Sequence, residues 1–94
     1  MKKVTIDLTD CKYLMELHER IRIALDFPKG YGNNWDAFWD FIHRECTYDY
    51  IIVKGSNTVS KDLVGSIKMM KDILEENKQY YQNSNHPVDY EFID

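Results

Sequence analysis

Hydrophobic and polar residues alternate in two short segments, one near each end of the chain. Apolar side chains stand at every second position in residues 4–8 and again in residues 88–92. This period-2 pattern is typical of β-strands that bury one face. A third segment, residues 48–54, contains the unbroken apolar trio Ile51-Ile52-Val53, which predicts a strand buried on both faces and therefore favours a parallel sheet.

Helical spacing of apolar residues fills the segments between these strands. The first helix is expected to start after Asp10, which can cap it, and to end before Pro28, which prevents its continuation. His18 lies on the apolar side of this helix and is predicted to be a core or boundary residue. Residues 60–64 predict a short helix, Gly65-Ser66 a break, and residues 67–78 a longer amphipathic helix.

A loop followed by a further helix occupies residues 27–43. Pro28, Gly30 and Gly32 interrupt regular structure, and Asn33-Asn34 offers a side chain that can cap the helix that follows. At about 100° per residue, Ala37, Phe38, Phe41 and Ile42 share one side of this helix. The opposite side is predicted to be exposed and carries Asp36, Asp40 and His43, with Trp39 at its border.

The predicted order is strand, helix, helix, strand, short helix, long helix, strand. Parallel strands need crossover connections, so we expect an α/β fold with a three-stranded parallel sheet covered by about four helices. The helix that starts near Trp35 should be partly peripheral. The 94 residues are too few to supply two hydrophobic cores, which predicts a single domain over residues 1–94.

Net charge narrows the class of partner, and cysteine content indicates the redox compartment. Sixteen acidic against twelve basic residues give a formal charge of −4, which argues against nucleic acid and favours a cationic partner. No segment has the uninterrupted apolar run of a signal peptide or a membrane span. Cys11 and Cys46 show no metal-binding spacing and are expected to be structural thiols in a reducing compartment, the cytoplasm.

The acidic side of the helix after Asn34 has two further interpretations. Acids are favoured near a helix N-terminus and are common on solvated helix faces, so Asp36 and Asp40 could be ordinary surface residues. Together with His43 they could also ligate a metal ion, although two helical turns are a long reach for one ion. The sequence contains no recognised catalytic motif, so we expect neither catalysis nor a cofactor or metal.

The run from Tyr31 to Asp40, Tyr-Gly-Asn-Asn-Trp-Asp-Ala-Phe-Trp-Asp, closely resembles the corresponding motif of the barstar family, the intracellular inhibitors of barnase-type ribonucleases. The opening lysine pair, the Leu17-His18 pair, Pro28, the order of elements and the chain length are also similar to that family. The resemblance implies a small α/β inhibitor whose second helix and preceding loop block the active site of a basic ribonuclease.

The resemblance also implies roles for particular residues. The acid matching Asp40 is expected to lie where the enzyme holds a substrate phosphate, because a carboxylate accepts charge-assisted hydrogen bonds as a phosphate oxygen does. Asp36 and Tyr31 are expected beside it, and Glu76 as a peripheral contact, with Glu75 as the alternative. The full set of expected partner-binding residues is Tyr31, Gly32, Asn34, Trp35, Asp36, Trp39, Asp40, His43 and Glu76.

Several positions depart from the family pattern. Gly30 stands where a second tyrosine would precede Tyr31, Trp35 replaces an aliphatic residue, and His43 replaces a small polar one. These changes bear on the identity of the target. The hypothesis is therefore a cytoplasmic protein, monomeric when free, that binds and blocks a basic ribonuclease of barnase type or a related toxin. The alternative is an immunity or regulatory interaction module on the same fold whose partner is not a ribonuclease.

Overall fold

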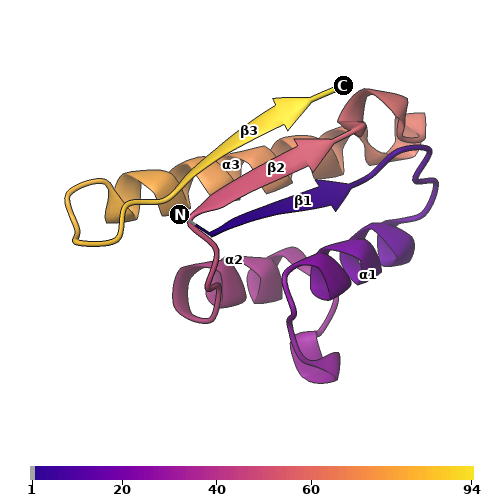
Figure 1. The fold of residues 1–94 in the computed structure, drawn as a ribbon. Coiled ribbons are helices and arrows are strands. Elements are labelled where there is room, and N and C mark those ends of the chain that lie inside the picture. The colour runs from indigo at the N-terminus through magenta and orange to yellow at the C-terminus, as the bar shows by residue number, and fades with distance from the viewer. Residues whose placement is uncertain (1) are drawn as a thin grey trace.

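The computed structural model describes residues 2–94 and has a layered α/β architecture (Figure 1). Within this range, three strands and three α-helices follow one another in the order β1 (Lys3–Asp7), α1 (Leu14–Ala24), α2 (Trp35–Arg44), β2 (Tyr50–Lys54), α3 (Val64–Tyr81) and β3 (Asp89–Ile93). Short 3-10 turns lie at η1 (Lys29–Tyr31), η2 (Ser56–Thr58) and η3 (Lys61–Leu63). The predicted α/β class with three parallel strands is confirmed.

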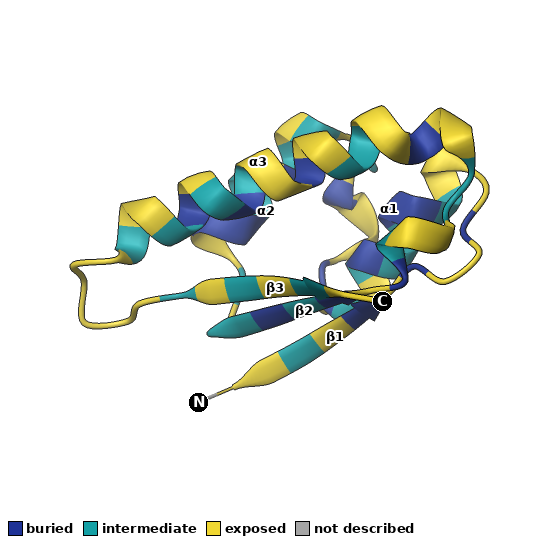
Figure 2. Ribbon diagram, turned by 90° about the horizontal axis from the view of Figure 1, so that it is seen from above, coloured by how far each residue is buried: buried dark blue, intermediate teal, exposed yellow. Residues whose placement is uncertain are grey.

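The sheet has the strand order β1-β2-β3 with every pair parallel, so that Ile6, Val53 and Phe92 stand side by side. Crossovers between parallel strands are right-handed, and strands added in one direction therefore place all their connections on the same face. Figure 2 shows this result, with α1, α2 and α3 on one side of the sheet. The helices pack against the face that carries Ile6 and Val53, both of which are fully buried.

The opposite face of the sheet is not covered by a helix from residues 2–94 (Figure 2). Thr5, Ile52 and Glu91 form one cross-strand row on it, and Ile52 is half-buried while the other two are exposed. The prediction that the trio Ile51-Ile52-Val53 is buried on both faces is therefore wrong for Ile52. The trio is explained instead by a central strand whose neighbours on both sides shield its middle residue.

The core lies between the sheet and the helical layer. Most of its largest fully buried side chains come from β1, β2, the three helices and the η1 turn: Ile6, Leu17, His18, Ile21, Tyr31, Phe38, Val53, Met70 and Leu74. At about 25 cal/mol per Å² of apolar surface removed from water, burial of such side chains is the main stabilising contribution to a fold of this size. Among residues 2–94, no helix is both long and apolar enough to cross a membrane.

Two helix boundaries differ from the sequence prediction. Asp10 adopts a positive φ of 58° and its N–H donates to Thr58 Oγ1 at 2.8 Å, so α1 begins only at Leu14 after the N-cap residue Tyr13. Gly65 lies inside the first turn of α3, because a glycine costs only about 1 kcal/mol in a helix and removes no hydrogen bond. The predicted short helix is the turn η3, which runs directly into α3, and this gives three α-helices in residues 2–94 where about four were expected.

Candidate functional site: the loop before α2 and its outward face

The loop before α2 is held in place by its own polar groups. Asn34 caps the helix, since its Oδ1 accepts the Ala37 N–H at 2.7 Å and its Nδ2 donates to Gly32 O at 3.1 Å. Gly32 turns the chain with a φ of 97°, a conformation that a side chain would strain. The predicted cap at Asn33-Asn34 is thus confirmed for Asn34, and the two predicted site residues Gly32 and Asn34 fix where α2 starts.

Tyr31 lies in the interior, with 1% of its surface exposed. Its ring contacts those of Phe27 and Phe41, with centroids 5.4 and 5.6 Å away, and its hydroxyl lies 3.1 Å from His18 Nδ1. Burial raises the pKa of the Tyr31 hydroxyl above its ordinary value. The expectation that the Tyr31 side chain lies on the partner-facing surface is therefore corrected: Tyr31 anchors the loop from below.

Trp35 connects this anchor to α2. Its ring lies 4.4 Å from that of His18 and 5.5 Å from that of Phe38, measured between centroids, and the residue is half-buried. Burial lowers the pKa of His18 to about 4, so the imidazole is neutral at pH 7. His18 was expected to be a core or boundary residue and is fully buried. Together, His18, Tyr31 and Trp35 attach the loop and the first turn of α2 to α1.

The outward face of α2 carries Asp36, Trp39 and Asp40. Asp36 is exposed, and Trp39 keeps 37% of its surface exposed despite its size. Half of the Asp40 side chain is exposed, and its Oδ1 lies 3.2 Å from Arg44 Nε, one helical turn further on. Two carboxylates and an indole therefore share one accessible surface, which suits a partner that offers cationic and apolar groups together.

His43 does not share this exposure. Only 8% of its surface is accessible, its ring is stacked on that of Trp39 with centroids 4.2 Å apart, and its Nδ1 lies 2.7 Å from Trp39 O. The Tyr81 hydroxyl donates to the backbone carbonyl of His43, and the Tyr80 ring meets its imidazole edge-on. The predicted exposed trio Asp36, Asp40 and His43 is corrected to an exposed acidic pair with a buried histidine behind Trp39.

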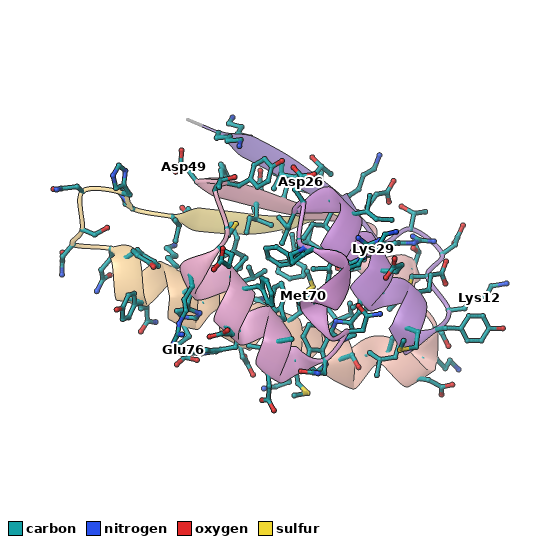
Figure 3. The ribbon with its side chains drawn as sticks, turned by 90° about the horizontal axis from the view of Figure 1, so that it is seen from below. Lys12, Asp26, Lys29, Asp49, Met70 and Glu76 are labelled. Carbon is teal, nitrogen blue, oxygen red and sulfur yellow. The ribbon has the colours of Figure 1, made fainter. Side chains whose placement is uncertain are left out.

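Glu76 is exposed on α3, which packs against α2. Figure 3 shows Glu76 beside α2, whereas Met70 of the same helix points between the helices. The neighbouring Glu75 accepts hydrogen bonds from the Tyr90 hydroxyl and from Gln79 at 2.6 and 3.0 Å. Glu75 thus ties α3 to β3, whereas Glu76 makes no side-chain hydrogen bond or ion pair within residues 2–94.

The geometry supports neither a metal site nor a reactive thiol. In the part of the chain that the structure describes, residues 2–94, no group of three His, Cys, Asp or Glu side chains could hold a metal ion. Burial raises the pKa of Cys46 and of the fully buried Cys11, which disfavours the reactive thiolate of each.

Comparison with known proteins places the chain in a family. The family model described as "Barstar (barnase inhibitor)" matches residues 1–93. The chain belongs to the barstar family. A relative from Bacillus subtilis (strain 168), named "Putative ribonuclease inhibitor YrdF", is 33% identical to it over 75 residues, which cover 80% of each of the two chains. Membership of the barstar family confirms the resemblance seen in the motif from Tyr31 to Asp40.

Sequence reasoning missed two features of this barstar-family surface. The first is the ion pair between Asp40 and Arg44, which the i, i+4 spacing of opposite charges on one helix could have indicated. The second is the pair Tyr80 and Tyr81, which covers His43 from α3. No local pattern in the sequence points to this second contact, because it depends on how α2 and α3 are placed against each other.

Proposed function

We propose that this protein is an inhibitor of a basic, barnase-type ribonuclease and blocks its active site with the outward face of α2. The observation that carries the proposal is the accessible surface of Asp36, Trp39 and Asp40 in a chain of the barstar family. The name of the Bacillus subtilis relative supports the same class of target. The chain itself performs no reaction in this proposal.

The proposed mechanism is electrostatic imitation of the substrate. A ribonuclease binds the RNA phosphate with cationic side chains, and the Asp40 carboxylate offers those side chains an acceptor of similar geometry and charge. Asp36 adds negative charge one turn earlier on α2, and Trp39 supplies apolar area beside them. The net charge of −4 also raises the rate at which the protein meets a cationic enzyme.

Arg44 forms an ion pair with Asp40 on this surface. Its guanidinium partly neutralises Asp40 in the free protein, because the two groups form an exposed i, i+4 ion pair. Such pairs contribute only about 0.3–0.5 kcal/mol, so a basic group of the enzyme can displace Arg44 at small cost. The loop residues Gly32 and Asn34, the buried Tyr31 and the half-buried Trp35 fix the start of α2. His43 supports Trp39.

The experiment is a binding measurement between the purified protein and a barnase-type ribonuclease. We expect Asp40→Ala to weaken the complex by at least about 30-fold, since removing one partner of a desolvated charge pair costs about 2 kcal/mol or more. Glu76→Ala should weaken it by less than about fivefold, as is usual for a peripheral ion pair. Glu91→Ala, an exposed acid on the uncovered face of the sheet, is the matched control and should have no effect.

Equal effects of Asp40→Ala and Glu91→Ala would contradict the proposed surface, because the two substitutions change net charge identically and differ only in position. No binding by the unaltered protein would contradict the proposed target.

A further inference from the structure

Tyr80 on α3 exposes more of its surface than any other large hydrophobic residue in positions 2–94, with 72% accessible. It follows Glu76 by four residues, and residues four apart lie on the same side of a helix. Figure 3 shows Glu76 beside α2. Tyr80 therefore stands on the side of α3 that borders α2, with its ring open to a partner.

His43 connects Tyr80 to the outward face of α2. The imidazole lies 4.2 Å from the Trp39 ring and 5.8 Å from the Tyr80 ring, measured between centroids. The rings of Trp39 and Tyr80 are therefore no further apart than these two distances together. Both residues are exposed, whereas the imidazole that joins them is buried.

A partner that docks on Asp40 and Trp39 also reaches Tyr80. A protein interface of standard size buries about 800 Å² on each partner, which corresponds to a patch roughly 30 Å across. Tyr80 lies well within that distance of Trp39. Tyrosine is also among the residues that most often contribute a large share of the binding energy of an interface.

The charges around Tyr80 favour a cationic group on its ring. Glu76 places a carboxylate one helical turn before Tyr80. Lys78, the basic residue of α3 closest to it in sequence, forms an ion pair with an acid of β3 at 3.1 Å. Arg44 of α2 is directed to Asp40. These two cations of the chain are thus engaged with other acids.

We propose that Tyr80 is a specificity-determining contact of the inhibitory surface, and that its ring receives a lysine or arginine side chain of the ribonuclease. A cation is attracted to the negative face of an aromatic ring, and more strongly once the interface excludes water. Basic ribonucleases that carry a cation at the matching position gain affinity over those that do not. The proposal rests on the proposed function for the basic partner, and it extends the contact surface from α2 onto α3.

The test measures the binding of Tyr80 variants to the barnase-type ribonuclease. Tyr80→Phe keeps the aromatic face and should bind within about twofold of the unaltered protein. Tyr80→Leu keeps an apolar side chain without that face and should weaken the complex about threefold to fivefold, and Tyr80→Ala at least about tenfold. Thermal unfolding establishes that each variant is folded.

Tyr13 provides a matched control, because it is a tyrosine of nearly equal exposure, 70%. Its neighbour Lys12 lies at the opposite end of the molecule from Glu76 (Figure 3). Tyr13→Ala should leave the affinity unchanged. Nitration with tetranitromethane, mapped by mass spectrometry, should modify Tyr13 and Tyr80 in the free protein and only Tyr13 in the complex. A Tyr80 that merely supported Trp39 through His43 would stay accessible.

Equal binding of Tyr80→Ala and the unaltered protein would overturn the assignment, as would nitration of Tyr80 in the complex. Equal binding of the Phe and Leu variants would overturn the contact between a cation and the ring. If Asp40→Ala weakens the complex and none of the Tyr80 variants does, the assignment of Tyr80 fails while the proposed function stands. No binding by the unaltered protein overturns both, because the proposed cation belongs to that ribonuclease.

Discussion

Because the imidazole of His18 is buried, we predict that the free energy of unfolding decreases as the pH falls from 7.5 to 4.5. The size of the decrease is set by the shift in the pKa of His18. The ring is fully buried, and its Nε2 has no hydrogen-bond partner within residues 2–94. Burial lowers the pKa of His18 to about 4 in the folded protein, against a value of about 6.5 in an unfolded chain. The folded state therefore binds fewer protons than the unfolded state in the interval between these values.

The sign follows from this difference. A histidine with a lowered folded pKa contributes its full stability above the unfolded value, near pH 6.5, and loses it as pH falls towards the folded value, near pH 4. For one group with these two pKa values, the free energy of unfolding decreases by roughly 1 kcal/mol at pH 5.5 and by roughly 2 to 3 kcal/mol at pH 4.5. The total available from the shift is about 3 kcal/mol.

The assay is urea denaturation at several pH values, performed on the unaltered protein and on His18→Gln. The glutamine variant will be less stable at neutral pH, but it lacks the titrating group, so its stability should fall less steeply between pH 7.5 and pH 5.5. The difference between the two curves isolates His18 from His43, His86 and the carboxylates. Parallel curves over this interval would refute the claim that His18 is held neutral by burial.

The remaining predictions concern the charge next to Asp40 and the conformation of two glycines. Arg44→Gln removes the cation that faces Asp40, and we expect it to increase the association rate with a basic ribonuclease severalfold at low salt and less at high salt, measured by stopped-flow; an unchanged rate would contradict steering by this surface. Gly55→Ala should destabilise the protein by about 1–3 kcal/mol in urea denaturation, because φ is 76° and a Cβ there would lie 2.8 Å from Thr9 Cα. Gly65→Ala is its matched control, since a Cβ at this position in α3 meets nothing within 4 Å, and it should stabilise by about 0.5–1 kcal/mol; equal effects of the two substitutions would contradict the assigned backbone conformations.

Local sequence patterns predicted the strands and helices whose apolar residues recur with a simple period. The alternation in residues 4–8 and 88–92 and the apolar side of α2 correspond to observed strands and to a helix face on which Phe38 and Ile42 are buried. The cap at Asn34 was predictable because its chemistry involves only residues within one turn. Such features depend on the chain's near neighbours, which the sequence displays directly.

Features that depend on distant residues were not predictable in this way. A helical wheel places His43 with Asp36 and Asp40, but it cannot show that Tyr80 and Tyr81 of α3 cover that part of α2. The aromatic ring of Tyr31 could have pointed outward or inward, and its contacts with Phe27, Phe41 and His18 exist only in the folded chain. The uncovered sheet face likewise follows from the strand order, which no local segment encodes.

The central claim is that the outward face of α2 occupies the active site of a basic ribonuclease. Its most direct test is the hydrolysis of a short RNA by a barnase-type ribonuclease at increasing ratios of this protein. We predict that activity disappears at one equivalent and that excess RNA substrate slows the inhibition. Asp40→Ala should raise the inhibition constant by at least about 30-fold, whereas Glu91→Ala should leave it unchanged. Full ribonuclease activity in the presence of several equivalents of the unaltered protein would contradict the account.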